Sequence, residues 1–136
     1  MMTHRKVRLF GYVIFERGVG EFGPIYSGIR GQDAVNFLLR VGRGEVHSAL
    51  YHHEIGHIDL VFGTGGANGY GLAHILEKHP NIVSRLHELI QRSKILQKLD
   101  DRIIVLYEPN IKSIISLTWH ESEKKWLVTA YEKIPD

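Results

Sequence analysis

The spacing of apolar residues changes along the chain near residue 100. Before that point, apolar side chains recur three and four positions apart, which is typical of amphipathic helices. Three such segments are predicted as helices: residues 33–41, 72–79 and 82–99. After that point the segments are short and rich in Ile, Val, Tyr and Trp, which predicts strands. These strands cover residues 102–107, 111–119 and 125–132, with turns at 109–110 and 121–123.

The first part of the chain also contains strand-like segments between glycine-rich loops. Residues 7–15 and 58–62 predict strands, and the glycines in 18–24 and 64–71 predict loops. Residues 45–51 fit neither pattern. Helices followed by an antiparallel meander indicate an α+β fold, in which N-terminal helices pack on the sheet.

Composition limits the class of protein. The 136 residues are enough for one domain, and 43% hydrophobic with 24% charged residues is a globular balance. No apolar stretch approaches the roughly 18 residues of a membrane helix, and no signal peptide is expected after the basic N-terminus. The absence of cysteine excludes disulfides, thiolate catalysis and cysteine zinc sites.

Charge and histidine content leave several functions open. The net charge of +2 and the pI of about 8.9 permit an anionic partner without requiring one. Nine histidines are many for this length, and histidine both titrates near neutral pH and binds metals. The bland alternative is that these histidines are scattered surface residues.

The run from His53 through Glu54 to His57 matches the zinc-peptidase pattern H-E-x-x-H. On a helix, this spacing puts two histidines one turn apart, with the glutamate as general base. Here a predicted strand follows at once, and Gly63 stands where a third ligand is often found. Glu77 would have to supply that ligand from another helix. We therefore expect no zinc site, and keep the zinc peptidase as an alternative.

A second histidine cluster follows the glycine-rich turn. His74 and Lys78 are four residues apart on one face of the predicted helix 72–79, and His79 follows. Histidine can move a proton and lysine can stabilise a phosphate, which suits phosphodiester chemistry. The simpler interpretation is an amphipathic helix whose polar face carries basic groups.

The last predicted strand carries hydroxyl groups on one face. Strand alternation puts Thr129 and Tyr131 on the side opposite Trp126, which we expect in the core. Hydroxyl groups are suitable phosphate donors. An ordinary solvent-facing strand is the alternative.

Five blocks in order resemble the phage-associated nuclease domains of the barnase–EndoU–colicin–RelE group. They are Gly44-Glu45-Val46, the segment from Ile55 to Gly63, Gly71 to Ile75 with Lys78-His79, Ser116 to Trp119, and Trp126 to Tyr131. The resemblance runs from about Gly31 to Glu132. It implies a curved antiparallel sheet of about four strands in a nuclease domain over 31–136, after an N-terminal extension over 1–30.

The resemblance also implies metal-independent RNA cleavage without a cofactor. In this class of reaction the 2′-hydroxyl attacks the adjacent phosphate and leaves a 2′,3′-cyclic phosphate. We expect His74 as the main proton-transfer group, with His79 as a second candidate. Asp59 would orient a histidine or act as base, and phosphate binding falls to Lys78, Thr129 and Tyr131.

The resemblance further implies partners and a place of action. RNA would be the substrate, and an immunity protein or antitoxin would be a partner of a toxin of this kind. We expect action in the cytoplasm, either of the producing cell or of a target cell after delivery, and no membrane partner. An inactive RNA-binding or phage structural module is the alternative that keeps the fold without the chemistry.

Overall fold

The computed structural model describes residues 5–9 and 11–133. The described strands are β1 Arg5–Leu9, β2 Tyr12–Gly20, β3 Gly23–Ser27, β4 Glu45–His52, β5 Gly56–Val61, β6 Lys94–Lys98, β7 Arg102–Tyr107, β8 Ile111–Trp119 and β9 Ser122–Glu132. The helices are α1 Gly31–Val41, α2 Gly71–Lys78, α3 Pro80–Val83 and α4 Leu86–Gln91. Within the described part of the chain, no helix is long and apolar enough to cross a membrane.

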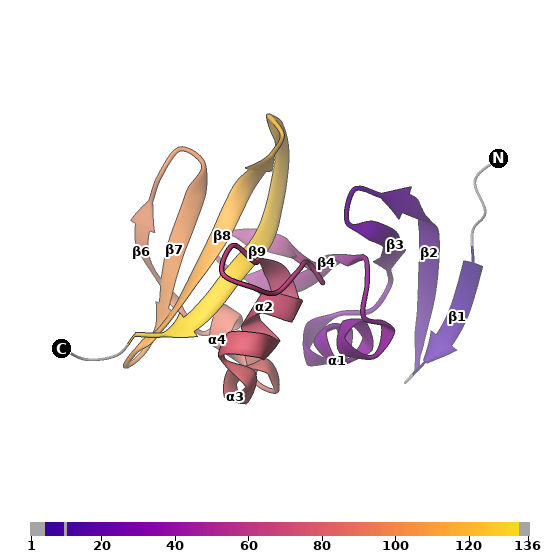
Figure 1. Ribbon diagram of the computed structural model, residues 1–136, viewed down its shortest axis with the longest axis horizontal. Coiled ribbons are helices and arrows are strands. Elements are labelled where there is room, and N and C mark those ends of the chain that lie inside the picture. The colour runs from indigo at the N-terminus through magenta and orange to yellow at the C-terminus, as the bar shows by residue number, and fades with distance from the viewer. Residues whose placement is uncertain (1–4, 10, 134–136) are drawn as a thin grey trace.

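The strands form a single sheet in the order β1-β2-β3-β4-β5-β9-β8-β7-β6. Two neighbouring pairs are parallel, β3 with β4 and β5 with β9, and the others are antiparallel. The β3–β4 junction is short, because only two residue pairs are in register there. In Figure 1 the N-terminal strands β1–β3 and the C-terminal strands β6–β9 lie at opposite ends of the molecule.

The core lies on one face of the sheet, between the central strands and the helices. Helix α1 contacts β4, α2 contacts β5 and β9, and α4 contacts β4 and β7. On β5, Ile58 and Leu60 are completely buried, whereas Asp59 between them is only partly buried. On β9, Leu127 and Ala130 belong to the same apolar core. The alternate side chains of these strands face away from that core and are free to build a site.

The expected fold class is wrong. We expected N-terminal helices on about four strands, but the sheet has nine strands, and the helices lie between strands along the chain. The glycine-rich segment 18–24 was expected as a loop, yet it forms the end of β2 and the start of β3. Segment 45–51, unassigned from its pattern, is most of β4. Pairing with neighbouring strands of the sheet, which the spacing of apolar residues does not record, decided these segments.

The predicted helix 82–99 is also wrong in its second half. The chain forms α3 and α4 and then turns into β6, which pairs with β7 at the edge of the sheet. The buried Ser93 hydroxyl donates to the carbonyl of Ile90 at 2.8 Å, at the point where the helix ends. Leu96 is 45% exposed, so its apolar side chain lies outside the core and its spacing was misleading.

The antiparallel meander is confirmed, with one change on its last strand. Strands β7, β8 and β9 pair as predicted, but the register of β9 on β8 shifts between Leu127 and Thr129. This β-bulge reverses the alternation, so that Thr129 and Tyr131 share the face of Trp126 instead of opposing it. Trp126 is buried, as predicted, but on the face of the sheet that it shares with Thr129 and Tyr131.

Gly44 provides a test of the β3–β4 junction. Its φ is +88°, and an added Cβ would lie 2.3 Å from the carbonyl oxygen of Pro24. We expect Gly44→Ala to destabilise the protein by on the order of 3 kcal/mol, because strain and a backbone clash add. The control is Gly42→Ala, which has a φ of +74° but open space, and which should cost about 1 kcal/mol. Urea unfolding of both variants would measure the difference. Equal losses of unfolding free energy would contradict the backbone clash at Gly44 as the cause.

Candidate active site

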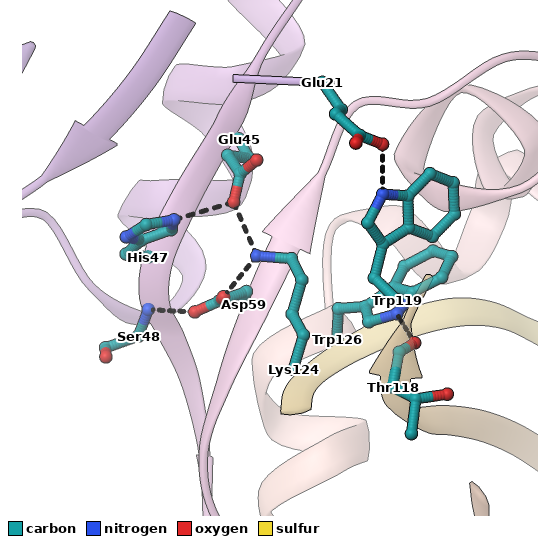
Figure 2. Close-up of polar contacts among 9 residues, drawn as sticks. All are labelled: Glu21, Glu45, His47, Ser48, Asp59, Thr118, Trp119, Lys124 and Trp126. Carbon is teal, nitrogen blue, oxygen red and sulfur yellow. Dashed lines mark hydrogen bonds and ion pairs between the residues drawn. The ribbon is translucent and has the colours of Figure 1, made fainter. Parts of the chain in front are cut away.

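Four side chains from three strands form a hydrogen-bonded cluster on the face away from the helices. The ammonium group of Lys124 on β9 donates to Glu45 Oε1 on β4 at 2.7 Å and to Asp59 Oδ2 on β5 at 2.6 Å. The ring Nε2 of His47 lies 2.7 Å from the same Glu45 oxygen. The backbone N–H of Ser48 donates to Asp59 Oδ1 at 2.8 Å. Figure 2 shows the lysine between the two carboxylates and the imidazole beyond Glu45.

Irregularities in two strands help to assemble this cluster. The register of β4 on β5 shifts between Val46 and Leu50, and within this irregular stretch Ser48 has a φ of 55°. The register of β9 on β8 shifts next to Lys124. β-Bulges re-aim side chains and are frequent beside active sites. Here they direct the backbone N–H of Ser48 and the side chain of Lys124 toward Asp59.

The charges of Glu45 and Lys124 stabilise each other. Burial raises the pKa of Glu45, but the hydrogen bonds from His47 and Lys124 outweigh it, so that the pKa lies below its ordinary value. Burial lowers the pKa of Lys124, but the hydrogen bonds to Asp59 and Glu45 outweigh it and raise the pKa. Both groups are therefore ionised at neutral pH.

His47 is the titratable group of the cluster near neutral pH. The hydrogen bond to Glu45 raises the pKa of His47 above 6.5, against the effect of burial, and the negative charge of Asp59 adds to the rise. The side chain is 42% exposed, so solvent and ligands reach the ring. When protonated, His47 can donate one N–H to Glu45 and offer the other to a ligand.

The cluster borders two adjoining pockets. One, of about 450 Å³, is lined by Glu21, His47, Asp59, Trp119, His120, Ser122, Glu123 and Lys124. The other, of about 420 Å³, is lined by His57, Asp59, Leu117, Glu123, Lys124 and Lys125. Asp59 and Lys124 belong to both. The pockets therefore combine imidazoles, ammonium groups, a hydroxyl and carboxylates around one hydrogen-bonded centre.

The donor set of the cluster does not fit a metal ion. Glu45, His47 and Asp59 offer ligand atoms within 4.8 Å of one another. However, the ammonium group of Lys124 lies between the two carboxylates at hydrogen-bond distance, where a metal ion would otherwise neutralise them. A cation there would have to displace a charged lysine, which Coulomb repulsion opposes.

The H-E-x-x-H segment does not form the helix that a zinc peptidase needs. It spans the turn between β4 and β5, with His53 in the turn and His57 on β5 opposite Tyr51. Glu77, considered as a third ligand, accepts a hydrogen bond from the backbone N–H of Gly66. The strand expected after the motif is confirmed as β5. Because His57 lies on this strand, the two histidines do not have helical spacing.

The catalytic and phosphate-binding residues predicted from the sequence are only partly brought together. Asp59 lies in the cluster, and Thr129 and Tyr131 share its face of the sheet, because Asp59 pairs in register with Trp126. The Tyr131 ring lies 6.4 Å from the ring of His79, centroid to centroid.

The remaining predicted residues lie on α2. His74 is partly buried, and its Nδ1 atom is buried without a hydrogen-bond partner among the described residues. Lys78 is exposed, and its ammonium group lies 3.8 Å from Glu77 Oε1. The described contacts connect neither side chain with Asp59.

Sequence reasoning missed Glu45, His47 and Lys124. Glu45 and His47 are two positions apart in a segment whose pattern predicted neither helix nor strand. If this segment had been assigned as a strand, both side chains would have been placed on one face. For Lys124 there was no local signal, since 65 residues separate it from Asp59.

The comparison with known families supplies the class of protein. A family model described as phage-Barnase-EndoU-ColicinE5/D-RelE like nuclease1 matches residues 49–135, well over half of the chain. No curated protein and no solved structure matched the chain. The protein is therefore a nuclease of the phage-associated barnase–EndoU–colicin–RelE class, and within that class it belongs to the PBECR1 family. This confirms the resemblance seen in the sequence. Asp59 and Lys124 lie inside the matched residues, and Glu45 and His47 lie just before them.

Replacing the central lysine tests the cluster. Lys124→Met should lower the free energy of unfolding at pH 7 by on the order of 3 kcal/mol, because two carboxylates that are largely buried lose their cation. Because the native pKa of Glu45 is depressed, its contribution is present above the unfolded pKa and is lost as pH falls through the native pKa. The deficit of the variant should therefore shrink below about pH 4.5.

Lys125→Met is the matched control. This neighbouring lysine is exposed, and among the described residues its ammonium group donates to the carbonyl of Ile55 alone. Its loss should cost about 1 kcal/mol or less. Urea unfolding across pH would measure both variants, and equal effects, or a Lys124→Met deficit that does not change with pH, would contradict the assigned charges.

Proposed function

We propose that the protein is an endoribonuclease that cleaves RNA without a metal, by attack of the 2′-hydroxyl on the adjacent phosphate. The nuclease family supports phosphodiester cleavage in general. The observation that carries the finer proposal is the Glu45–His47 hydrogen bond beside Lys124, at the edge of a pocket. An oriented imidazole next to an ammonium group combines proton transfer with stabilisation of a phosphorane.

His47 is proposed as the general acid. Its raised pKa keeps a larger share of the imidazole protonated near neutral pH, which suits donation of a proton to the leaving 5′-oxygen. Glu45 has its carboxylate on one ring nitrogen, and it therefore fixes the ring orientation and stabilises the imidazolium. The exposed part of the ring leaves the other nitrogen for the substrate.

His120 is proposed as the base that takes the 2′-hydroxyl proton. It lines the same pocket as His47, and its side chain is 70% exposed. Asp59 is less suited to this step than the sequence suggested, because Ser48 and Lys124 each engage one of its carboxylate oxygens. We therefore assign Asp59 to positioning Lys124.

Lys124 is proposed to stabilise the negative charge of the phosphorane. Two of its three N–H donors are directed at Glu45 and Asp59, which leaves one for a phosphate oxygen. The carboxylates hold the ammonium group in place, so little reorganisation is needed when charge develops on the phosphate. In this mechanism Lys124 supplies the positive charge that stabilises the phosphorane, and no metal is required for that purpose.

The predicted residues around α2 form a second candidate active site. His74 as the proton-transfer group would work with His79, Lys78, Thr129 and Tyr131, as the resemblance implied. A toxin-type role, with an immunity protein or antitoxin as partner, is a further part of the proposal and depends on RNA cleavage. Both centres predict the same products, so variants must distinguish them.

The decisive comparison is His47→Ala against His74→Ala. We expect His47→Ala to reduce RNA cleavage in excess EDTA by roughly a hundred- to ten-thousand-fold, the usual loss for a general acid–base group. His74→Ala should retain cleavage within about threefold of wild type, with unchanged circular dichroism. Analysis of the products should identify a 2′,3′-cyclic phosphate and a 5′-hydroxyl.

The opposite pattern would move the active site to α2. If wild-type protein cleaves RNA only with an added divalent metal, the metal-independent mechanism is wrong. If it binds RNA without cleaving it under any of these conditions, the alternative of an inactive binding module replaces the enzyme.

A second prediction concerns the pH profile. Because the Glu45 hydrogen bond raises the pKa of His47, the acid form of His47 persists above pH 6.5 and is lost as pH rises through its native pKa. Glu45→Gln should move the alkaline limb of kcat/KM to lower pH, since the neutral amide no longer stabilises the imidazolium. The control is Glu54→Gln in the exposed β4–β5 turn, which should leave the limb in place. An unchanged limb in Glu45→Gln would exclude His47 as the titrating acid.

A further inference from the structure

Four aromatic rings pack together beside the pocket of about 450 Å³, and one of them, Trp119, lines that pocket. Phe22 lies 4.6 Å from Trp119 and 5.6 Å from Trp126, centroid to centroid. Tyr70 lies 6.1 Å from Phe22, 6.3 Å from Trp119 and 5.7 Å from Trp126. The rings come from four segments: the β2–β3 turn, the residue before α2, and strands β8 and β9. None of these four rings takes part in the mechanism proposed above.

The two tryptophans of this group differ in what can reach them. Trp126 is 5% exposed, and its indole N–H donates to the carbonyl of Thr118 at 2.9 Å. Trp119 is only partly buried and lines the pocket that contains His47 and His120. Figure 2 shows the Trp119 indole directed at Glu21, whose carboxylate accepts its N–H. Trp119 can therefore contact a pocket ligand, and Trp126 supports it from behind.

We propose that Trp119 stacks on a nucleobase of the RNA substrate, and that Glu21 is the residue that positions its indole ring. This rests on the proposed function, because it assigns the base-binding part of the same pocket. An indole presents a large π surface, and stacking on an aromatic side chain is worth roughly 1–3 kcal/mol per base without requiring a particular base. A rigid ring loses little conformational freedom on binding.

The position of Trp119 connects base binding to the chemistry. His120, the proposed base, is the next residue, and its ring lies 4.4 Å from that of Trp119. The turn that holds His120 has positive φ at His120 and at Glu121, as in a two-residue hairpin turn. A base stacked on Trp119 would therefore place its own ribose close to the group that takes the 2′ proton.

The N-terminal hairpin supplies the groups that hold this platform. Glu21 and Phe22 form the β2–β3 turn, outside the residues matched by the nuclease family. Glu21 Oε2 also lies 3.4 Å from the ring nitrogen of His120, an ion pair when that histidine is protonated. In this protein the hairpin therefore completes the substrate pocket, and the base subsite depends on residues 21–22.

Tryptophan fluorescence tests this inference without requiring cleavage. The chain has two tryptophans, so Trp126→Phe leaves Trp119 as the single emitter. Each of the four 3′-ribonucleoside monophosphates, which contain no cleavable internucleotide bond, should quench this emission saturably. The matched variant Trp119→Phe reports only the buried Trp126, and its emission should change little.

Two variants of Glu21 test its positioning role. Glu21→Ala should raise the Kd of the mononucleotides about five- to tenfold, because the indole N–H loses its acceptor and the ring its fixed orientation. Glu21→Gln should restore binding to near the original Kd, since its amide oxygen still accepts that hydrogen bond. Trp119→Ala in the otherwise unchanged protein should raise KM for RNA by roughly ten- to a hundredfold and lower kcat less.

The outcomes separate this inference from the proposed function. If wild-type protein cleaves RNA, but mononucleotides fail to quench Trp119 and Trp119→Ala keeps its KM, the stacking platform is wrong and the nuclease stands. If mononucleotides quench Trp119 but no RNA is cleaved, the base subsite stands and the catalytic proposal fails. Equal quenching in both single-tryptophan variants would also overturn the assignment. Equal losses in Glu21→Ala and Glu21→Gln would contradict the positioning role.

Discussion

The ammonium group of Lys124 joins carboxylates from two other strands, and the candidate site depends on this ion bridge. Without the lysine, Glu45 and Asp59 would be two largely buried negative charges close together, which the sheet could not hold ionised at neutral pH. With it, Glu45 stays charged and can raise the pKa of His47. A single cation thus stabilises the centre of the sheet and sets the protonation of the imidazole beside it.

The parallel pairing of β5 with β9 makes this bridge geometrically feasible. Asp59 and Trp126 are in register there, although they belong to distant parts of the chain. The helices bury the opposite face, with Ile58, Leu60 and Leu127 in the core. One side of these strands therefore packs in the core and stabilises the fold, and the other side carries the polar groups. Bulges in β4 and β9 then depart from regular pleating at the positions where polar groups converge.

The pockets beside the bridge are lined by the carboxylates of Glu21, Asp59 and Glu123 and by Lys124 and Lys125, so they carry no net positive charge when their histidines are neutral. Binding of RNA by charge alone would therefore be weak, and contacts with the bases gain importance. The aromatic group around Trp119 offers such contacts, and it draws on Phe22 from the N-terminal hairpin. The nine-stranded sheet explains this arrangement, because strands β1–β3 extend the sheet beyond the strands of the matched nuclease region.

The sequence by itself determined the elements whose signals are local: the C-terminal meander, helix α2, strand β5 after the H-E-x-x-H segment, and the nuclease class through five short blocks. The elements follow from periodicity and turn residues, which neighbouring positions encode, and the class follows from the resemblance of the blocks to a known family. Only the tertiary structure decided that 94–98 is an edge strand, that nine strands form one sheet, and that Lys124 meets Glu45 across 79 residues of chain. The physical reason is that the order of strands in the sheet and the ion bridge join groups far apart in sequence, and that apolar spacing does not record even the pairing of 94–98 with the next strand, β7.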